Sequence, residues 1–144
     1  MEKYDSLKLS NQLCFPLYAC AKDIVRKYTP YLNELNITYT QYITMMVMWE
    51  NETITSKELG DILYLDSGTL TPLLKRLESK GYLTRERSET DERMLIVALT
   101  DKGAMLKDAA VKVPIKMQGC INLAPEEMHI LYKLLYKILD SKGE

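Results

Sequence analysis

The sequence contains few of the residues on which metal-binding and disulfide-rich proteins depend. It has one histidine, His129, and three cysteines, Cys14, Cys20 and Cys120, which form no CxxC pair. A familiar zinc site needs clustered ligands at short spacings, so we expect no metal site, and in a reducing compartment we expect free thiols rather than structural disulfides. The six glycines and five prolines are too few for a collagen-like or low-complexity chain.

Long apolar runs and an excess of one charge are also missing. No stretch of 18 apolar residues occurs, and the first residues, MEKYDSLKLSNQ, are too charged for the core of a signal peptide. We therefore expect a soluble, cytoplasmic protein with no membrane partner. The 20 acidic and 19 basic residues give a net charge of −1, which does not indicate nucleic-acid binding by itself. Hydrophobic residues make up 47% of the 144, enough to form one domain with a core.

The first half of the chain predicts helices. Apolar residues recur at three- and four-residue steps from Leu13 to Tyr28, which predicts a helix that Thr29-Pro30 should interrupt. Pro16 lacks an N–H, so this helix either begins near Pro16 or bends there. A second helix is expected from Thr38 or Thr40 to Trp49.

The middle of the chain predicts a helix-turn-helix. Thr55 and Glu58 form a capping-box pattern that opens a short helix ending near Leu63. Asp66 or Ser67 caps the next helix, which runs through Lys80 and stops at Gly81. Two short helices joined by a three- or four-residue turn are typical of DNA-binding helix-turn-helix units.

The remaining elements complete a winged fold. Residues 82–87 and 93–99 predict a β-hairpin with a charged tip. Thr100 caps a long helix that Pro114 bends or ends, and Pro125 opens a last helix through Leu139. We therefore predict a single domain, 1–144, that is mainly α with a small β-hairpin wing. Its winged helix-turn-helix core spans about 37–100, and terminal helices at about 6–35 and 101–141 form a dimerisation region, because they cannot bury their apolar faces on so small a core.

The candidate DNA contacts lie on the second helix of this unit and on the hairpin. Small hydroxyl side chains in a first helical turn allow close approach to base edges, and basic residues neutralise phosphates or enter the minor groove. These candidates are Ser67, Thr69, Thr71, Lys75, Arg76, Arg85, Arg87 and Arg93. Asp91 is expected to brace the tip by pairing with Arg93. An ordinary amphipathic surface helix and a solvated, salt-bridged turn remain the alternatives, because residues 53–93 carry no broad basic field.

Two stretches resemble a known family. DSGTLTPLLKRLESKGYLTRERSETDERMLIVALTDKG, from Asp66, is similar to the recognition-helix-to-wing core of the MarR family of bacterial transcription regulators. NQLCFPLYAC, with Tyr28, Tyr39-Thr40-Gln41-Tyr42 and Trp49-Glu50, resembles the branch of that family that senses organic hydroperoxides and other oxidants (OhrR-type). The resemblance covers essentially the whole chain.

The resemblance implies roles for particular residues. Cys14 stands where that branch has its oxidant-sensing cysteine, and Tyr28 and Tyr39 stand where tyrosines of the partner subunit hydrogen-bond the sulfur. Cys120 corresponds to a second cysteine that, in some members, joins the sensing cysteine across the dimer. The implied apolar sensor pocket contains Phe15, Met45 and Trp49. The alternatives are an inert Cys14 on a helical face and an incidental Cys120.

These features together predict a homodimeric repressor that binds a pseudo-palindromic operator in double-stranded DNA. An organic hydroperoxide or related oxidant would release it by oxidising Cys14, and we expect no cofactor and no enzymatic activity. One alternative is a repressor released by a small phenolic ligand in the dimer pocket without thiol chemistry. A protein-binding winged helix remains open. The sequence disfavours a thiol peroxidase that uses Cys14, because no Arg or His stands beside Cys14 to activate it.

Overall fold

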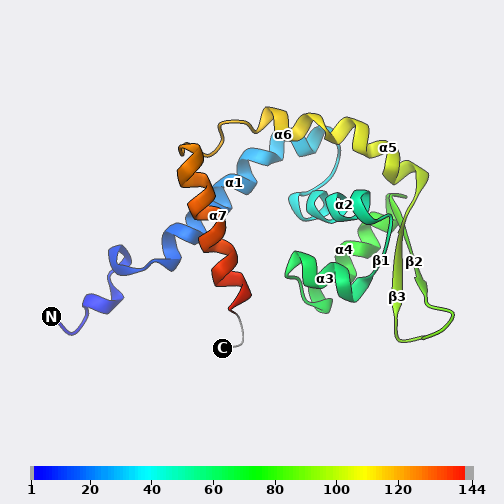
Figure 1. The fold of residues 1–144 in the computed structure, drawn as a ribbon, viewed down its shortest axis with the longest axis horizontal. Coiled ribbons are helices and arrows are strands. Elements are labelled where there is room, and N and C mark those ends of the chain that lie inside the picture. Colours follow the sequence, from blue (N-terminus) through cyan, green and yellow to red (C-terminus); the bar gives the residue numbers. More distant parts are fainter. Residues whose placement is uncertain (1, 142–144) are drawn as a thin grey trace.

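The computed structural model describes residues 2–141 and is mainly helical, with one small sheet (Figure 1). Residue 1 and residues 142–144, which the predicted 1–144 domain includes, lie outside the described residues. Two short 3-10 turns, Asp5–Leu7 and Leu9–Asn11, precede the first helix. The elements that follow are α1 Cys14–Glu34, α2 Tyr39–Asn51, β1 Thr53–Thr55, α3 Ser56–Leu63, α4 Ser67–Ser79, β2 Leu83–Arg87, β3 Leu95–Leu99, α5 Asp101–Ala110, α6 Lys112–Lys116 and α7 Pro125–Asp140.

The sheet has three antiparallel strands in the order β1-β3-β2. The predicted hairpin is confirmed as β2 and β3, in which Arg85 lies opposite Val97. The third strand, β1, was not predicted; it pairs with the other edge of β3, with Ile54 opposite Val97. Three residues are too short to show the alternation that identifies a strand in a sequence. The side chain of Ile54 is buried in the core, and this packing holds β1 in place beside β3.

Side-chain caps open both helices of the helix-turn-helix, and of the predicted Thr55–Glu58 capping box the structure forms the half in which Thr55 accepts. The hydroxyl of Thr55 accepts a hydrogen bond from the backbone N–H of Glu58 (3.1 Å), and α3 begins at the next residue. The carboxylate of Asp66 accepts from the N–H of Thr69 (2.8 Å) at the start of α4. After Lys80, Gly81 adopts a left-handed backbone with φ of 86°, which a side chain would strain, and α4 ends there.

The prediction that Thr29-Pro30 interrupts the first helix is wrong. α1 continues through Pro30 to Glu34, and Leu32 beyond the proline is buried in the core. Tertiary packing of that last turn offsets the lost backbone hydrogen bond, whose removal costs about 3 kcal/mol in a helix interior. Pro16 is the third residue of α1, where the N–H has no intrahelical partner, so the helix begins at Cys14 without a bend caused by Pro16.

Two apolar clusters form the interior of one protomer. The first lies under the winged helix-turn-helix and contains buried residues of α2, α3, α4 and the sheet, Leu77 and Val97 among them. The second joins the end of α1 to α2, α5 and α6 through Leu32, Tyr42 and Val113. Three partly buried side chains pack against both clusters: Trp49, Tyr82 and Leu106.

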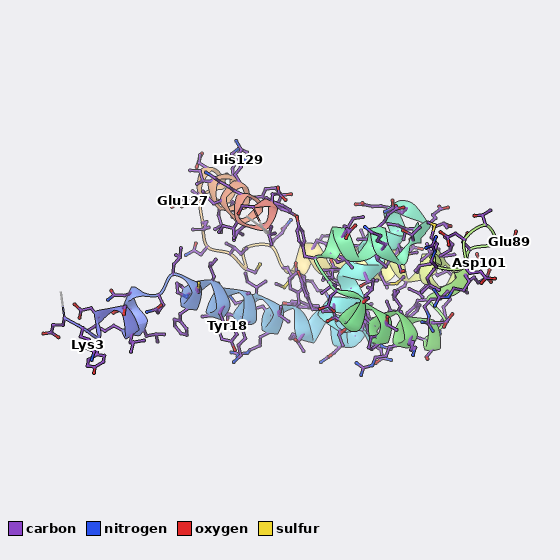
Figure 2. The ribbon with its side chains drawn as sticks, turned by 90° about the horizontal axis from the view of Figure 1, so that it is seen from below. Lys3, Tyr18, Glu89, Asp101, Glu127 and His129 are labelled. Atoms are coloured by element: carbon purple, nitrogen blue, oxygen red, sulfur yellow. The ribbon has the colours of Figure 1, made fainter. Side chains whose placement is uncertain are left out.

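The two terminal helices extend away from this interior. Figure 2 shows the segment with Lys3 and the half of α1 with Tyr18 projecting from the winged core. The helix α7, which carries Glu127 and His129, contacts that core at its end, where the hydroxyl of Tyr64 donates to Oδ1 of Asp140 at 3.2 Å. Leu32 is the one buried residue of α1, and α7 has none between Pro125 and Asp140. Their apolar side chains therefore face solvent in an isolated protomer. The exposed ones include Leu13, Phe15, Leu17, Ile130, Leu131, Leu134, Leu135, Ile138 and Leu139.

Among the glycines of residues 2–141, Gly103, in the first turn of α5, packs most tightly against its neighbours. A Cβ atom at Gly103 would overlap the carbonyl of Tyr82 and lie 2.8 Å from Cδ1 of Leu99. We expect Gly103→Ala to lower the free energy of unfolding by about 1–3 kcal/mol, because a backbone neighbour cannot move aside as a flexible side chain can. Thermal unfolding at matched protein concentration measures this loss.

Gly68→Ala is the matched control, because Gly68 also lies in the first turn of a helix. Its Cβ would meet the Asp66 carboxylate at 3.5 Å, an ordinary contact. We expect its stability to be unchanged or raised by up to about 1 kcal/mol. Equal destabilisation by both substitutions would contradict the special packing of Gly103.

Candidate functional site

The first turns of α4 present small polar side chains to solvent. Ser67, Thr69 and Thr71 are exposed, and Lys75 and Arg76 are exposed on the following turn. The opposite face of α4 is anchored in the first apolar cluster by its buried leucines, Leu70, Leu73, Leu74 and Leu77. The helix thus presents an accessible polar face of the kind that approaches base edges and phosphates.

Capping at the start of α4 also sets the local charge. The N–H and hydroxyl of Thr69 stabilise the Asp66 carboxylate and hold its pKa below the usual range of an aspartate. Asp66 therefore stays ionised at the positive end of the helix dipole. This places a negative charge beside the predicted DNA-contacting turn, so binding there depends on hydrogen-bond geometry as well as on charge.

Arg85 braces the hairpin against α4. Its Nε and Nη2 atoms donate to Oε1 of Glu78 at 3.1 and 3.0 Å, and its backbone N–H donates to Oε2 at 2.9 Å. These hydrogen bonds hold the pKa of Glu78 below its usual range. The side chain of Arg85 is 20% exposed, so this arginine holds β2 on α4, and its contact with DNA stays a prediction.

The tip of the wing lies at the far end of the molecule from the N-terminal segment, near the labelled Glu89 in Figure 2. Asp91 accepts from the backbone N–H of Arg93 at 3.0 Å and from its Nε at 3.4 Å, which is the pairing expected from the sequence. The Arg93 side chain is otherwise 93% exposed, and Arg87 is exposed on the outgoing strand. The contact of both arginines with DNA stays a prediction.

The thiols lie in three different surroundings. Cys14 is exposed as the first residue of α1, Cys20 is exposed further along the same helix, and Cys120 is half-buried after α6. Fourteen residues separate Cys14 from Tyr28, a rise of about 21 Å along a helix. One protomer therefore keeps Cys14 away from the tyrosines that the family resemblance assigns to it.

Three tyrosines gather at the other end of α1. The ring centroid of Tyr28 lies 5.1 Å from that of Tyr39 and 5.8 Å from that of Tyr42. Burial raises the pKa of each phenol, and the neighbouring Tyr39 and Cys120 raise the pKa of Tyr28 further. The cluster therefore holds neutral phenol donors beside the Cys120 thiol. Tyr42 was not among the predicted sensor residues, although it belongs to the same motif.

A cleft of about 300 Å³ lies next to this cluster, between α2 and the α5–α6 segment. Trp49 and Met46 line it, whereas Met45 is fully buried in the winged core. Phe15 lies 44% exposed at the start of α1, outside this cleft. The full lining is Tyr42, Met46, Trp49, Glu50, Lys107, Ala110, Val111 and Pro114.

Residues 2–141 contain neither a membrane-spanning helix nor a cluster of metal ligands. No helix in this part of the chain is long and apolar enough to cross a membrane. No group of three or more His, Cys, Asp or Glu side chains in it is arranged to hold a metal ion.

The helix order, the capped helix-turn-helix and the three-stranded wing define a winged helix-turn-helix protein. A family model described as transcriptional regulator SarA/Rot matches residues 26–110. The organic hydroperoxide resistance transcriptional regulator of Bacillus subtilis (strain 168) is 48% identical over 139 residues, covering 96% of this chain and 95% of that protein. The chain belongs to the MarR family of transcriptional regulators, and the resemblance inferred from its sequence is confirmed.

Solved structures are similar over nearly the whole chain. Reduced AbfR bound to DNA superposes with a TM-score of 0.81 at 34% identity, covering 99% of this chain and 100% of that one. Disulfide-formed AbfR gives a TM-score of 0.66 at 36% identity, with coverage of 95% and 96%. A mutant MarR from E. coli complexed with operator DNA gives 0.81 at 28% identity, with coverage of 96% and 99%.

The Glu78–Arg85 pair generates a pH-dependent prediction. Because the folded-state pKa of Glu78 is lowered, its carboxylate stabilises the fold above its unfolded-state pKa, about 4.3. That contribution is lost as the pH falls through the lower folded-state value. We expect Glu78→Gln to unfold at a lower temperature than wild type at about pH 7, with the difference shrinking towards about pH 3.

Glu86→Gln is the control, since Glu86 is an exposed acid on the same strand that Arg85 occupies. We expect it to leave the melting temperature nearly unchanged at both pH values. If the Glu78→Gln difference were the same at both pH values, the charge on Glu78 would not be its source.

Proposed function

We propose that this chain is a homodimeric, DNA-binding transcriptional repressor that senses organic hydroperoxides or related oxidants through Cys14. The proposal rests on the distance, within one protomer, between the Cys14 thiol and the tyrosine cluster. An exposed thiol begins α1, whereas a cluster of wholly or partly buried phenols with Cys120 lies about four helical turns away. Two antiparallel copies of α1 bring the thiol of one protomer to the phenols of the other.

The exposed apolar faces of α1 and α7 support the dimer. Between these helices lies an apolar groove of about 320 Å³, lined by Leu13, Pro16, Leu17, Cys20, Ala21, Ile24, Ile121, Leu131 and Leu135. Exposed apolar area of this extent is unusual on a monomer, and burying it against a second copy supplies the hydrophobic free energy for association. In this arrangement residues 37–100 form the DNA-binding unit, and residues 6–35 and 101–141 form the dimerisation region.

A twofold dimer of this kind fits a pseudo-palindromic operator. Each protomer contributes one α4 to a major groove and one hairpin to the flanking minor groove, with half-sites about 34–36 Å apart or slightly more. The DNA-bound states of AbfR and of the MarR mutant support this use of the fold. A regulator of this kind acts where the chromosome lies, so we assign it to the cytoplasm.

The proposed sensing chemistry takes two steps. The Cys14 thiolate attacks the O–O bond of a hydroperoxide, which yields a sulfenic acid and releases the alcohol after protonation. The Cys120 thiol of the other protomer then condenses with the sulfenic acid, forming a disulfide and releasing water. The disulfide persists until an external thiol reduces it, so the cycle is a switch rather than catalytic turnover.

Replacing Cys14 tests the sensor. We expect Cys14→Ser to bind operator DNA with wild-type affinity but to remain bound after peroxide, because the serine hydroxyl is not oxidised. Gel-shift titrations before and after peroxide measure both properties. Cys20→Ser is the matched control on the same helix and should keep peroxide release. Release of DNA from Cys14→Ser by peroxide would remove the thiol-sensing proposal.

Non-reducing gels test the role of Cys120. We expect peroxide to produce a covalent dimer in wild type and in Cys20→Ser, but not in Cys14→Ser or Cys120→Ser. A covalent dimer that persists without Cys120 would assign the second thiol elsewhere.

The charge on α4 generates a separate prediction. Lys75→Ala removes one phosphate contact per protomer, so we expect affinity to fall on all DNA sequences alike. A plot of the logarithm of the DNA association constant against the logarithm of the salt concentration should become shallower, with a slope smaller in magnitude by about one per protomer. Lys112→Ala, on α6, is the control for loss of the same charge away from the DNA-binding face. An unchanged slope in Lys75→Ala would mean that this residue does not contact phosphate.

A second candidate function is supported by the cleft beside Trp49. Its apolar wall and the charged side chains of Glu50 and Lys107 in its lining suit a small phenolic ligand. A repressor of that kind would release DNA with the ligand in both wild type and Cys14→Ser, and reductant would not restore binding.

A further inference from the structure

Trp49 is the one tryptophan of the chain, and it lies between the two apolar clusters. Its ring lines the cleft beside Tyr42, whose ring lies 5.8 Å from that of Tyr28 and 6.3 Å from that of Tyr39. On its other side the indole Nε1 donates a hydrogen bond to the carbonyl of Gly103 at 2.9 Å. Trp49 therefore touches both the tyrosine side of the molecule and the first turn of α5.

The first turn of α5 lies directly on the junction between the recognition helix α4 and the wing. The backbone N–H of Thr100 donates to the carbonyl of Tyr82 (3.2 Å), and its hydroxyl donates to the carbonyl of Gly81 (2.6 Å). The Nζ atom of Lys102 donates to the carbonyl of Lys80 at 2.8 Å. Thr100 and Lys102 thus donate hydrogen bonds to the three consecutive backbone carbonyls of residues 80–82, which connect α4 to β2.

Gly103 makes this connection stiff. Because it has no side chain, its backbone packs against the carbonyl of Tyr82 with no room for a Cβ atom. A displacement of the α5 turn cannot be absorbed by side-chain movement at this point, so the α4–β2 junction has to follow it. Trp49 is the side chain that reaches this turn from the cleft.

We propose that Trp49 is a positioning residue that couples the tyrosine cluster to the DNA-binding surface through its hydrogen bond to Gly103. A rearrangement of the tyrosines moves Tyr42 and the cleft wall, the indole carries that movement to the α5 turn, and the turn reorients α4 and the wing. The inference rests on the proposed function, because the rearrangement it transmits is the one that oxidation of Cys14 sets off.

Trp49→Phe tests the coupling, because it keeps an aromatic ring in the same place and removes the N–H donor. We expect the reduced variant to bind operator DNA within about threefold of wild type. We expect the loss of affinity on peroxide treatment to be about tenfold smaller than in wild type, within the usual range of allosteric coupling. Both affinities come from fluorescence anisotropy with labelled operator DNA.

Met46→Leu is the matched control, since Met46 lines the same cleft and its side chain has no hydrogen-bond donor. It should release DNA after peroxide as wild type does. Oxidation of Cys14, followed by mass spectrometry, should proceed equally in all three proteins. Full release of DNA from oxidised Trp49→Phe would overturn the inference and leave the proposed function intact. Failure of oxidised wild type to release DNA would instead remove the proposed function.

The fluorescence of Trp49 in the wild-type protein provides a measurement that does not depend on a variant. Because the chain has no second tryptophan, its emission reports this indole alone. We expect the emission maximum and intensity to change on oxidation and to return with reductant, in step with DNA release. Emission that stays constant while DNA is released would overturn the inference, even if Trp49→Phe failed to fold.

Discussion

The contact between the backbones of Gly103 and Tyr82 orients the whole protomer. It joins the first turn of α5 to the point where the recognition helix ends and the wing begins, and Thr100 and Lys102 reinforce it with hydrogen bonds. The winged core on one side and the helical cluster on the other meet here, with Trp49 in contact with both. In a protein with two small cores, such a junction is needed to transmit a structural change from one core to the other.

Surface chemistry divides the molecule into two regions with different partners. The winged half presents hydroxyls and scattered cations on well-capped elements, and its acidic residues balance its basic ones. Affinity there rests on fit to the groove rather than on a broad positive field. The terminal helices α1 and α7, whose positions Figure 1 shows, present exposed apolar side chains. A regulator that must bind DNA and also be released from it benefits from keeping these two surfaces separate.

Most of the sequence-based predictions that the structure confirms concern helix ends, which depend on interactions between residues close in sequence. Thr55, Asp66, Gly81 and Thr100 mark helix ends through hydrogen bonds and backbone preferences that act within a few residues, so they were visible in the sequence. The failures were of tertiary origin. Continuation of α1 through Pro30 depends on packing of distant residues, and β1 pairs with an edge of β3 that the folded chain brings to it. The Arg85–Glu78 brace likewise needs the fold to bring the two side chains together.

The length of α1 has a further consequence for how the protein responds. Since a rise of about 21 Å separates Cys14 from Tyr28 of the same chain, the sensor proposed above would be complete only in the dimer. Its sensitivity to oxidant would then fall on dilution, when protomers separate. Two defective copies, one lacking Cys14 and the other lacking Cys120, would restore one working site when they are mixed. In a cell, this dimer geometry would appear as complementation between two defective alleles of the same gene.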